Sequence, residues 1–213
     1  MKRTKYERYE SGSSVFEKTY KDYLGQVGRI DLFSIEQGLG TRVEGTEMII
    51  PLFGKPYRIS ERDIIDPSGE KPSFDICVIL FKYMLLCPDG YPEDNGWVSF
   101  RDFKDSGPLT AYFSHEVEEA ISEYYSGRIN ALQKNSEALG GYPPNPGFTY
   151  DVSMEFKLLP RVPILMLFND RDDEFPAKCS VLYEKRAENY LDAECLAIAG
   201  RLFLNSLKDA EVV

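Results

Sequence analysis

Four carboxylate side chains fall within five residues in the segment 169–176. They are Asp170, Asp172, Asp173 and Glu174. Carboxylate oxygens are the ligands that Mg²⁺ and Ca²⁺ prefer, so these four residues form a candidate metal site. The spacing is not that of an EF-hand, because the central glycine and the distal glutamate of that motif are missing. The alternative is a solvated acidic loop between two strands.

A second candidate chemistry is the binding of a ligand by aromatic and charged side chains. Glu174 precedes the apolar Phe175, and this setting favours a carboxylate that is held by backbone N–H groups or by an arginine. Arg161, just before a predicted strand, is one candidate partner for Glu174. Trp97, the only tryptophan, follows an acidic and aromatic loop and could line a pocket or anchor the core. The candidate ligand-binding residues are therefore Trp97, Arg161, Glu174 and Phe175.

Residues for acid–base or nucleophilic catalysis are scarce in this sequence. The one histidine, His115, lies in a helical pattern and reads as a surface or partly buried structural residue. Hydrolase, metalloprotease and phosphate-loop motifs are absent. The four cysteines are scattered without zinc or iron–sulfur spacing, so we expect reduced thiols that act as small apolar residues. The sequence thus offers no catalytic set, and no cofactor can be assigned from it.

The charge balance excludes several classes of partner. Thirty-five acidic residues against twenty-five basic ones give a net charge of -10, which repels phosphate backbones and anionic membranes. We therefore expect neither a nucleic-acid nor a membrane partner. The longest apolar run, residues 76–87, is shorter than the ~20 residues that span a bilayer. The basic start is not followed by the apolar stretch of a secretory signal, so a cytoplasmic location is expected.

The helices and strands expected around these residues indicate an α+β fold, in which a mostly antiparallel sheet packs against several helices. Residues 47–59 read as a hairpin, and the apolar helix after residue 73 as the buried centre. Short connections between the strands at 150–158, 162–168 and 177–183 favour a three-stranded meander. Further helices are expected at 14–26, 108–125, 128–139 and 191–207. One domain over 1–213 is the expectation, and the proline-rich segment 142–147 could mark a sub-domain break.

Six short runs stand out in the sequence, at residues 81–85, 96–101, 159–163, 172–177, 181–183 and 190–194. Together they resemble the domain of unknown function 3786 family. The resemblance covers most of the chain from about residue 15. It implies a protein of anaerobic bacteria or archaea, some of whose relatives carry an additional cysteine-rich iron–sulfur segment. This chain has no such segment. It also has Asp173 in place of a second glutamate and Tyr183-Glu184 in place of Phe-Asp, which weakens any redox role.

Three functional hypotheses follow from the sequence. The first is a non-catalytic ligand-binding or accessory domain in which the acidic loop and Trp97 border a site for a small molecule or a protein. The second is a metal-dependent enzyme that uses the acidic loop 170–174. The third is a subunit of a larger assembly, for which an exposed apolar patch would be the sign.

Overall fold

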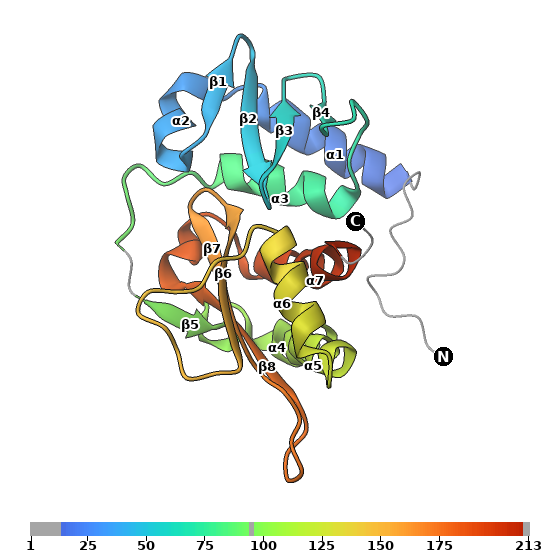
Figure 1. Ribbon diagram of the computed structural model, residues 1–213. Coiled ribbons are helices and arrows are strands. Elements are labelled where there is room, and N and C mark those ends of the chain that lie inside the picture. Colours follow the sequence, from blue (N-terminus) through green and yellow to red (C-terminus); the bar gives the residue numbers. More distant parts are fainter. Residues whose placement is uncertain (1–13, 94–95, 211–213) are drawn as a thin grey trace.

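The computed structural model describes residues 14–93 and 96–210, and Figure 1 shows their arrangement. The helices are α1 (Ser14–Val27), α2 (Leu32–Leu39), α3 (Phe74–Leu85), η2 (Phe100–Asp102), α4 (Gly107–Phe113), η3 (Ser114–Glu119), α5 (Ala120–Tyr125), α6 (Ile129–Ala138), η4 (Lys185–Asn189) and α7 (Ala193–Asp209). The strands are β1 (Arg42–Glu44), β2 (Glu47–Leu52), β3 (Lys55–Ile59), β4 (Ile64–Ile65), β5 (Trp97–Ser99), β6 (Val152–Leu159), β7 (Val162–Asn169) and β8 (Lys178–Glu184).

Two antiparallel four-stranded sheets confirm the predicted α+β class. The first sheet has the order β1-β2-β3-β4, and the second has the order β5-β8-β7-β6. The hairpin predicted at 47–59 is β2–β3, and the predicted meander is β6-β7-β8. The short strand β5 joins the meander by pairing with the end of β8. Among the described residues, no helix is long and apolar enough to cross a membrane.

Helix α3 lies at the centre of the fold, as its sequence predicts. It has apolar residues on all sides, and Cys77, Leu80 and Phe81 have no exposed surface. Figure 1 shows α3 between the first sheet above it and helix α7 below it. Because α3 contacts both α1 and α7, its buried surface joins the part of the molecule built on the first sheet to the part built on the second.

The β2–β3 turn forms a second joint between the halves. Leu52 and Lys55 are cross-strand partners, so Phe53 and Gly54 are the central turn residues. Phe53 has a φ of 47°, which is unusual for a bulky residue. Its N–H donates to the carbonyl of Leu158 at 2.9 Å, and its ring stacks on Phe203 of α7. These contacts explain why an aromatic residue occupies this turn.

The β7–β8 hairpin projects beyond the second half of the molecule (Figure 1). Its inner part is covered by η3 and α5, which contact β8. The sequence predicts one regular helix over 108–125, but η3 is a π-helical turn within it. Such turns are invisible in an apolar pattern and are frequent near functional sites.

Candidate functional site

The acidic loop lies where the sequence places it, between two strands, and it borders a hollow. Residues 170–177, hereafter the hairpin loop, connect β7 to β8. The hollow has a volume of about 710 Å³, within the range of ligand sites. It is lined by Asp151, Asn169, Asp170, Arg171, Asp172, Phe175, Pro176, Ala177 and Lys178.

Asp172 orders the tip of the hairpin loop. Its Oδ1 accepts hydrogen bonds from the N–H groups of Glu174, at 2.8 Å, and Phe175, at 2.7 Å. These donors hold the pKa of the Asp172 carboxyl below its usual range. The N–H of Asp172 donates to the carbonyl of Phe175 at 3.0 Å and closes the turn. The Phe175 ring, 66% exposed, is therefore displayed on a loop whose backbone is already ordered.

Asp170 ties the base of the loop to the helical layer. Its Oδ1 accepts from the N–H of Gly127, in the turn between α5 and α6, at 2.7 Å. The Arg171 guanidinium packs against the same turn, because a Cβ at Gly127 would lie only 3.1 Å from Arg171 Nη2. The N–H of Asp170 donates to Asp151 Oδ2 at 2.8 Å. The projecting hairpin is thus anchored on both sides of its base.

These contacts bear on the metal hypothesis. Asp170 and Asp172 direct an oxygen to backbone N–H groups, whereas Asp173 and Glu174 are exposed. Within residues 14–93 and 96–210, no group of three or more His, Cys, Asp or Glu side chains is arranged to hold a metal ion. The metal site at these four residues stays a prediction from the sequence.

Trp97 and Arg161 lie at the other end of the second sheet. Trp97 pairs with Glu184, the last residue of β8, whereas the hairpin loop precedes the first residue of that strand. The seven residues of β8 separate the two positions by roughly 20 Å. Arg161 precedes β7 and the loop follows it, so the length of β7 separates Arg161 from Glu174. The four candidate ligand-binding residues are therefore not brought together.

Arg161 has a different partner, the end of helix α2. Its guanidinium donates to the carbonyl oxygens of Gln37, at 3.0 Å, and Gly38, at 3.3 Å. A cation at these carbonyls satisfies acceptors that a helix end leaves open. The Tyr83 hydroxyl completes the cap, because it donates to the carbonyl of Leu39 at 2.6 Å and accepts from the N–H of Arg161 at 3.1 Å. Arg161 and Tyr83 thus hold the end of α2 in place, and no sequence pattern shows that these residues lie together.

A second hollow, of about 380 Å³, lies on the other side of the hairpin. We call it the edge groove. It is lined by Ser114, Glu118, Glu119, Ser122 and Glu123 from the helical side and by Pro176, Ala177, Lys178, Cys179 and Ser180 from the hairpin. Glu118 is half-buried, and burial raises the pKa of its carboxyl. Its Oε1 accepts from the N–H of Val181 at 3.0 Å.

Glu118 is not among the residues predicted from the sequence, although a signal for it exists. Ser114, Glu118 and Ser122 are spaced by four residues, which places polar groups on one helical face. That face borders the apolar positions Val117 and Ile121. A carboxylate beside an apolar stripe is a candidate for a buried, partnered group. What the spacing cannot reveal is the strand that this face meets.

His115, at the rim of the same helical segment, gives a pH-dependent prediction. Its Nδ1 lies 3.0 Å from Glu119 Oε2, and this hydrogen bond, with the charge of Glu116, raises the pKa of His115 above 6.5. The pairing stabilises the fold fully below the unfolded pKa and ceases to do so as the pH rises through the folded pKa. Because the chain has one histidine, a single NMR resonance reports this titration.

We expect Glu119→Gln to lower the His115 pKa towards the ordinary value, and Glu123→Gln to change it less. An unchanged pKa in Glu119→Gln would contradict the pairing.

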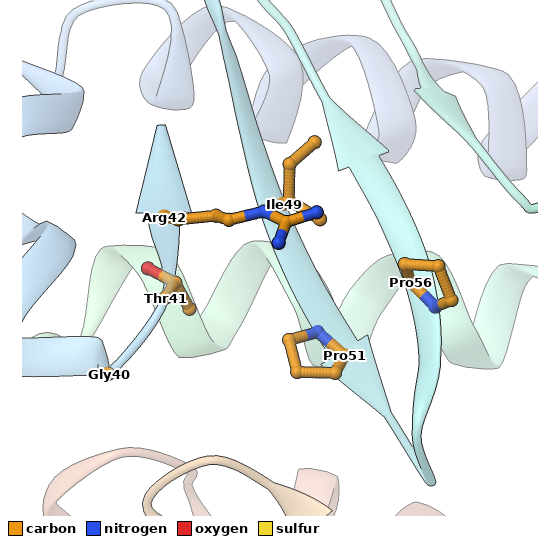
Figure 2. A pocket seen from close by; sticks show the side chains of 6 residues that line it. All are labelled: Gly40, Thr41, Arg42, Ile49, Pro51 and Pro56. Atoms are coloured by element: carbon orange, nitrogen blue, oxygen red, sulfur yellow. The ribbon is translucent and has the colours of Figure 1, made fainter. Parts of the chain in front are cut away.

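Two hollows in the first half of the molecule are weaker candidates. One, of about 260 Å³ on the outer face of the first sheet, is smaller than ordinary ligand sites. Figure 2 shows Arg42 extended across Ile49, with Pro51 and Pro56 on neighbouring strands. Its one cation, Arg42, already pairs with Glu44 at 2.9 Å. The other hollow, of about 700 Å³, surrounds the start of α2 and includes the exposed Phe33.

Comparison with known proteins assigns the chain to a family. A family model described as Domain of unknown function (DUF3786) matches residues 31–206. The chain belongs to the DUF3786 family. The match covers most of the chain and includes both sheets, the edge groove and the hairpin loop. No curated protein and no solved structure matches the chain. The DUF3786 assignment confirms the resemblance seen in the sequence and carries no catalytic or binding role with it.

Proposed function

We propose that this DUF3786 protein is a non-catalytic, cytoplasmic binding domain that contacts a partner protein through its β7–β8 hairpin. The observation that carries the proposal is the setting of Phe175. Phe175 is 66% exposed and lies at the tip of a loop that Asp172 and Asp170 already order. Preordered aromatic side chains lose little conformational entropy on binding and are frequent energetic centres of interfaces.

The charges around Phe175 indicate the nature of the partner. Asp173 and Glu174 are exposed beside the ring. The whole chain carries a net charge of -10. An exposed ring preceded by two carboxylates favours a partner surface with a hydrophobic pocket and basic groups, and the cations Arg171 and Lys178 of the adjoining hollow would meet acidic groups on that surface. The same arrangement fits both an accessory domain and a subunit of a larger assembly.

Replacement of Phe175 tests the proposal, and Phe33 supplies a matched control. Both rings are exposed to the same degree, 66% and 68%, and both border hollows of similar size. We expect Phe175→Ser and Phe33→Ser each to change the free energy of unfolding by less than about 0.5 kcal/mol. In quantitative affinity purification from the native host, a stoichiometric partner should be retained by wild type and Phe33→Ser. Recovery of this partner with Phe175→Ser should be at least tenfold lower.

Equal recovery of partners by the two variants would contradict the role of the hairpin. Turnover of any compound by the purified chain in a metabolite screen would contradict the non-catalytic assignment.

A further inference from the structure

The hollow at the start of α2, hereafter the α2 hollow, has the size and the apolar floor of a ligand site. Its volume is about 700 Å³. It lies between the connection from α1 to α2, the β1–β2 turn and the β3–β4 turn. Five aliphatic side chains line it, namely Val27, Ile30, Leu32, Val43 and Ile65. Val27 is buried, whereas the other four keep part of their surface exposed, so an apolar ligand would remove this surface from water.

Hydrogen bonds order two walls of the α2 hollow. Asp31 caps α2, because its Oδ1 accepts from the N–H of Phe33 at 3.1 Å. In the β3–β4 turn, the N–H of Ser60 donates to the carbonyl of Asp63 at 3.0 Å, and the Ser60 hydroxyl donates to Asp63 Oδ1 at 3.1 Å. Because both walls are already ordered, binding of a ligand between them costs little conformational entropy.

The rim of the α2 hollow carries an excess of negative charge. Its charged side chains are Asp31, Glu47, Glu61, Arg62 and Asp63. Glu47 already pairs with Arg58 at 3.0 Å, which leaves three carboxylates beside the single guanidinium of Arg62. Glu61 is exposed, and a Cβ at Gly28 would lie 3.5 Å from its Cβ, so the β3–β4 turn packs against the connection from α1 to α2. Carboxylates therefore border the hollow on both of these walls.

Phe33 adds an aromatic face to this rim. Its side chain is 68% exposed and lies in the first turn of α2, two residues after the capping Asp31. The face of an aromatic ring attracts a cation, and so do the carboxylates. A ligand with an apolar body and one ammonium group would match the floor, the ring and the carboxylates together, whereas the rim would repel an anion.

We propose that the α2 hollow binds a small hydrophobic amine. The aliphatic floor buries the apolar body of the amine, and Phe33 and Glu61 hold its ammonium group at the rim. The site is built on the first sheet, whereas the hairpin loop connects two strands of the second sheet. The inference therefore goes beyond the proposed function and does not depend on it.

An NMR titration of the full chain with 4-phenylbutylamine tests this assignment. We expect saturable shifts of backbone amides that border the hollow, among them those of Ile30, Val43 and Ile65. Two compounds with the same apolar body, 4-phenylbutanol and 4-phenylbutyrate, are the controls. The neutral alcohol should bind about fivefold more weakly than the amine or worse, and the carboxylate should cause no saturable shift. No saturable shift with the amine, or equal affinity for the amine and either control, would overturn the inference.

Two substitutions test the residues assigned to the ammonium group. Phe33→Ser removes the ring and Glu61→Lys reverses the charge, and each should weaken the binding of 4-phenylbutylamine about threefold or more. The matched controls are Phe175→Ser, at an equally exposed ring, and Glu70→Lys, at an exposed carboxylate outside the hollow. Both should change the affinity less than twofold. Thermal unfolding checks that all four variants fold. Wild-type affinity in either Phe33→Ser or Glu61→Lys would overturn the inference.

The two phenylalanine variants also separate the two proposals. Phe33→Ser should lose the amine and keep the native partner protein, whereas Phe175→Ser should lose the partner and keep the amine. If Phe175→Ser retains the partner, the hairpin contact is wrong and the amine site stands. If Phe33→Ser binds the amine like wild type, the amine site is wrong and the hairpin contact stands.

Discussion

Replacement of Gly200 by alanine should lower the free energy of unfolding by about 2 kcal/mol. Gly200 is buried in α7, and a Cβ there would lie 2.5 Å from Cε2 of Phe113. The Phe113 ring has little room to move, because it stacks on Phe100 at a centroid distance of 4.4 Å and lies near Tyr183. Overpacking of this kind costs ~1–3 kcal/mol or more, which exceeds the ~1 kcal/mol that alanine gains over glycine in a helix.

Gly25→Ala is the matched control for this substitution. Gly25 is an exposed position of α1, and nothing lies within 4 Å of the Cβ that alanine would add. The same chemical change should therefore stabilise the protein by about 0.5 kcal/mol. Urea unfolding should show a lower free energy of unfolding for Gly200→Ala and a higher one for Gly25→Ala. In the double variant Phe113→Leu/Gly200→Ala, the two effects should be less than additive, because the clash with the ring is removed. Gly200→Ala with wild-type stability would contradict the close packing of α7 on α4.

Tyr83→Phe should cost about 3 kcal/mol, although it removes a single oxygen atom. The hydroxyl satisfies the carbonyl of Leu39 and the N–H of Arg161, at the joint between α2 and the β6–β7 turn. Tyr83 and Leu39 have no exposed surface, so water cannot replace the lost partner. Each buried group left without a hydrogen bond costs ~1–3 kcal/mol. Burial also raises the pKa of Tyr83, which keeps the hydroxyl protonated as a donor.

Tyr91→Phe provides the control for the joint. The Tyr91 ring lies 5.2 Å from the guanidinium carbon of Arg161 but is largely exposed, and phenylalanine preserves the ring. We expect a change of less than about 0.5 kcal/mol. If chemical denaturation gives the same stability for Tyr83→Phe as for Tyr91→Phe, the capping role assigned to the hydroxyl is wrong.

Local patterns were enough to predict the elements that bury their own surface. Helix α3 is apolar on all sides, and the strands β6, β7 and β8 are joined by connections too short for parallel crossovers, so both predictions are confirmed. The short strands β1, β4 and β5 have two or three residues each and no pattern of their own. Strands β1 and β4 are completed by the neighbouring strands β2 and β3, whereas β5 is a strand only because the distant β8 supplies its hydrogen bonds.

The candidate site shows the same division between local and distant information. The acidic composition of residues 170–174 locates the hairpin loop correctly, because turn chemistry is local. The sequence could not show that Trp97 and Arg161 lie far from that loop. Their positions depend on strand pairing across more than eighty residues, since Trp97 pairs with Glu184. Glu118 escaped notice because its partner, the N–H of Val181, becomes available only where β5 ends.

Site-specific photo-cross-linking tests directly whether the tip of the hairpin loop contacts a partner protein, as we propose. Benzoylphenylalanine is placed at position 175 or, as control, at position 33, and the full chain is irradiated in cells of the native host. We expect one discrete cross-linked product for position 175 and none for position 33. No product at position 175, or the same products at both positions, would contradict the proposal.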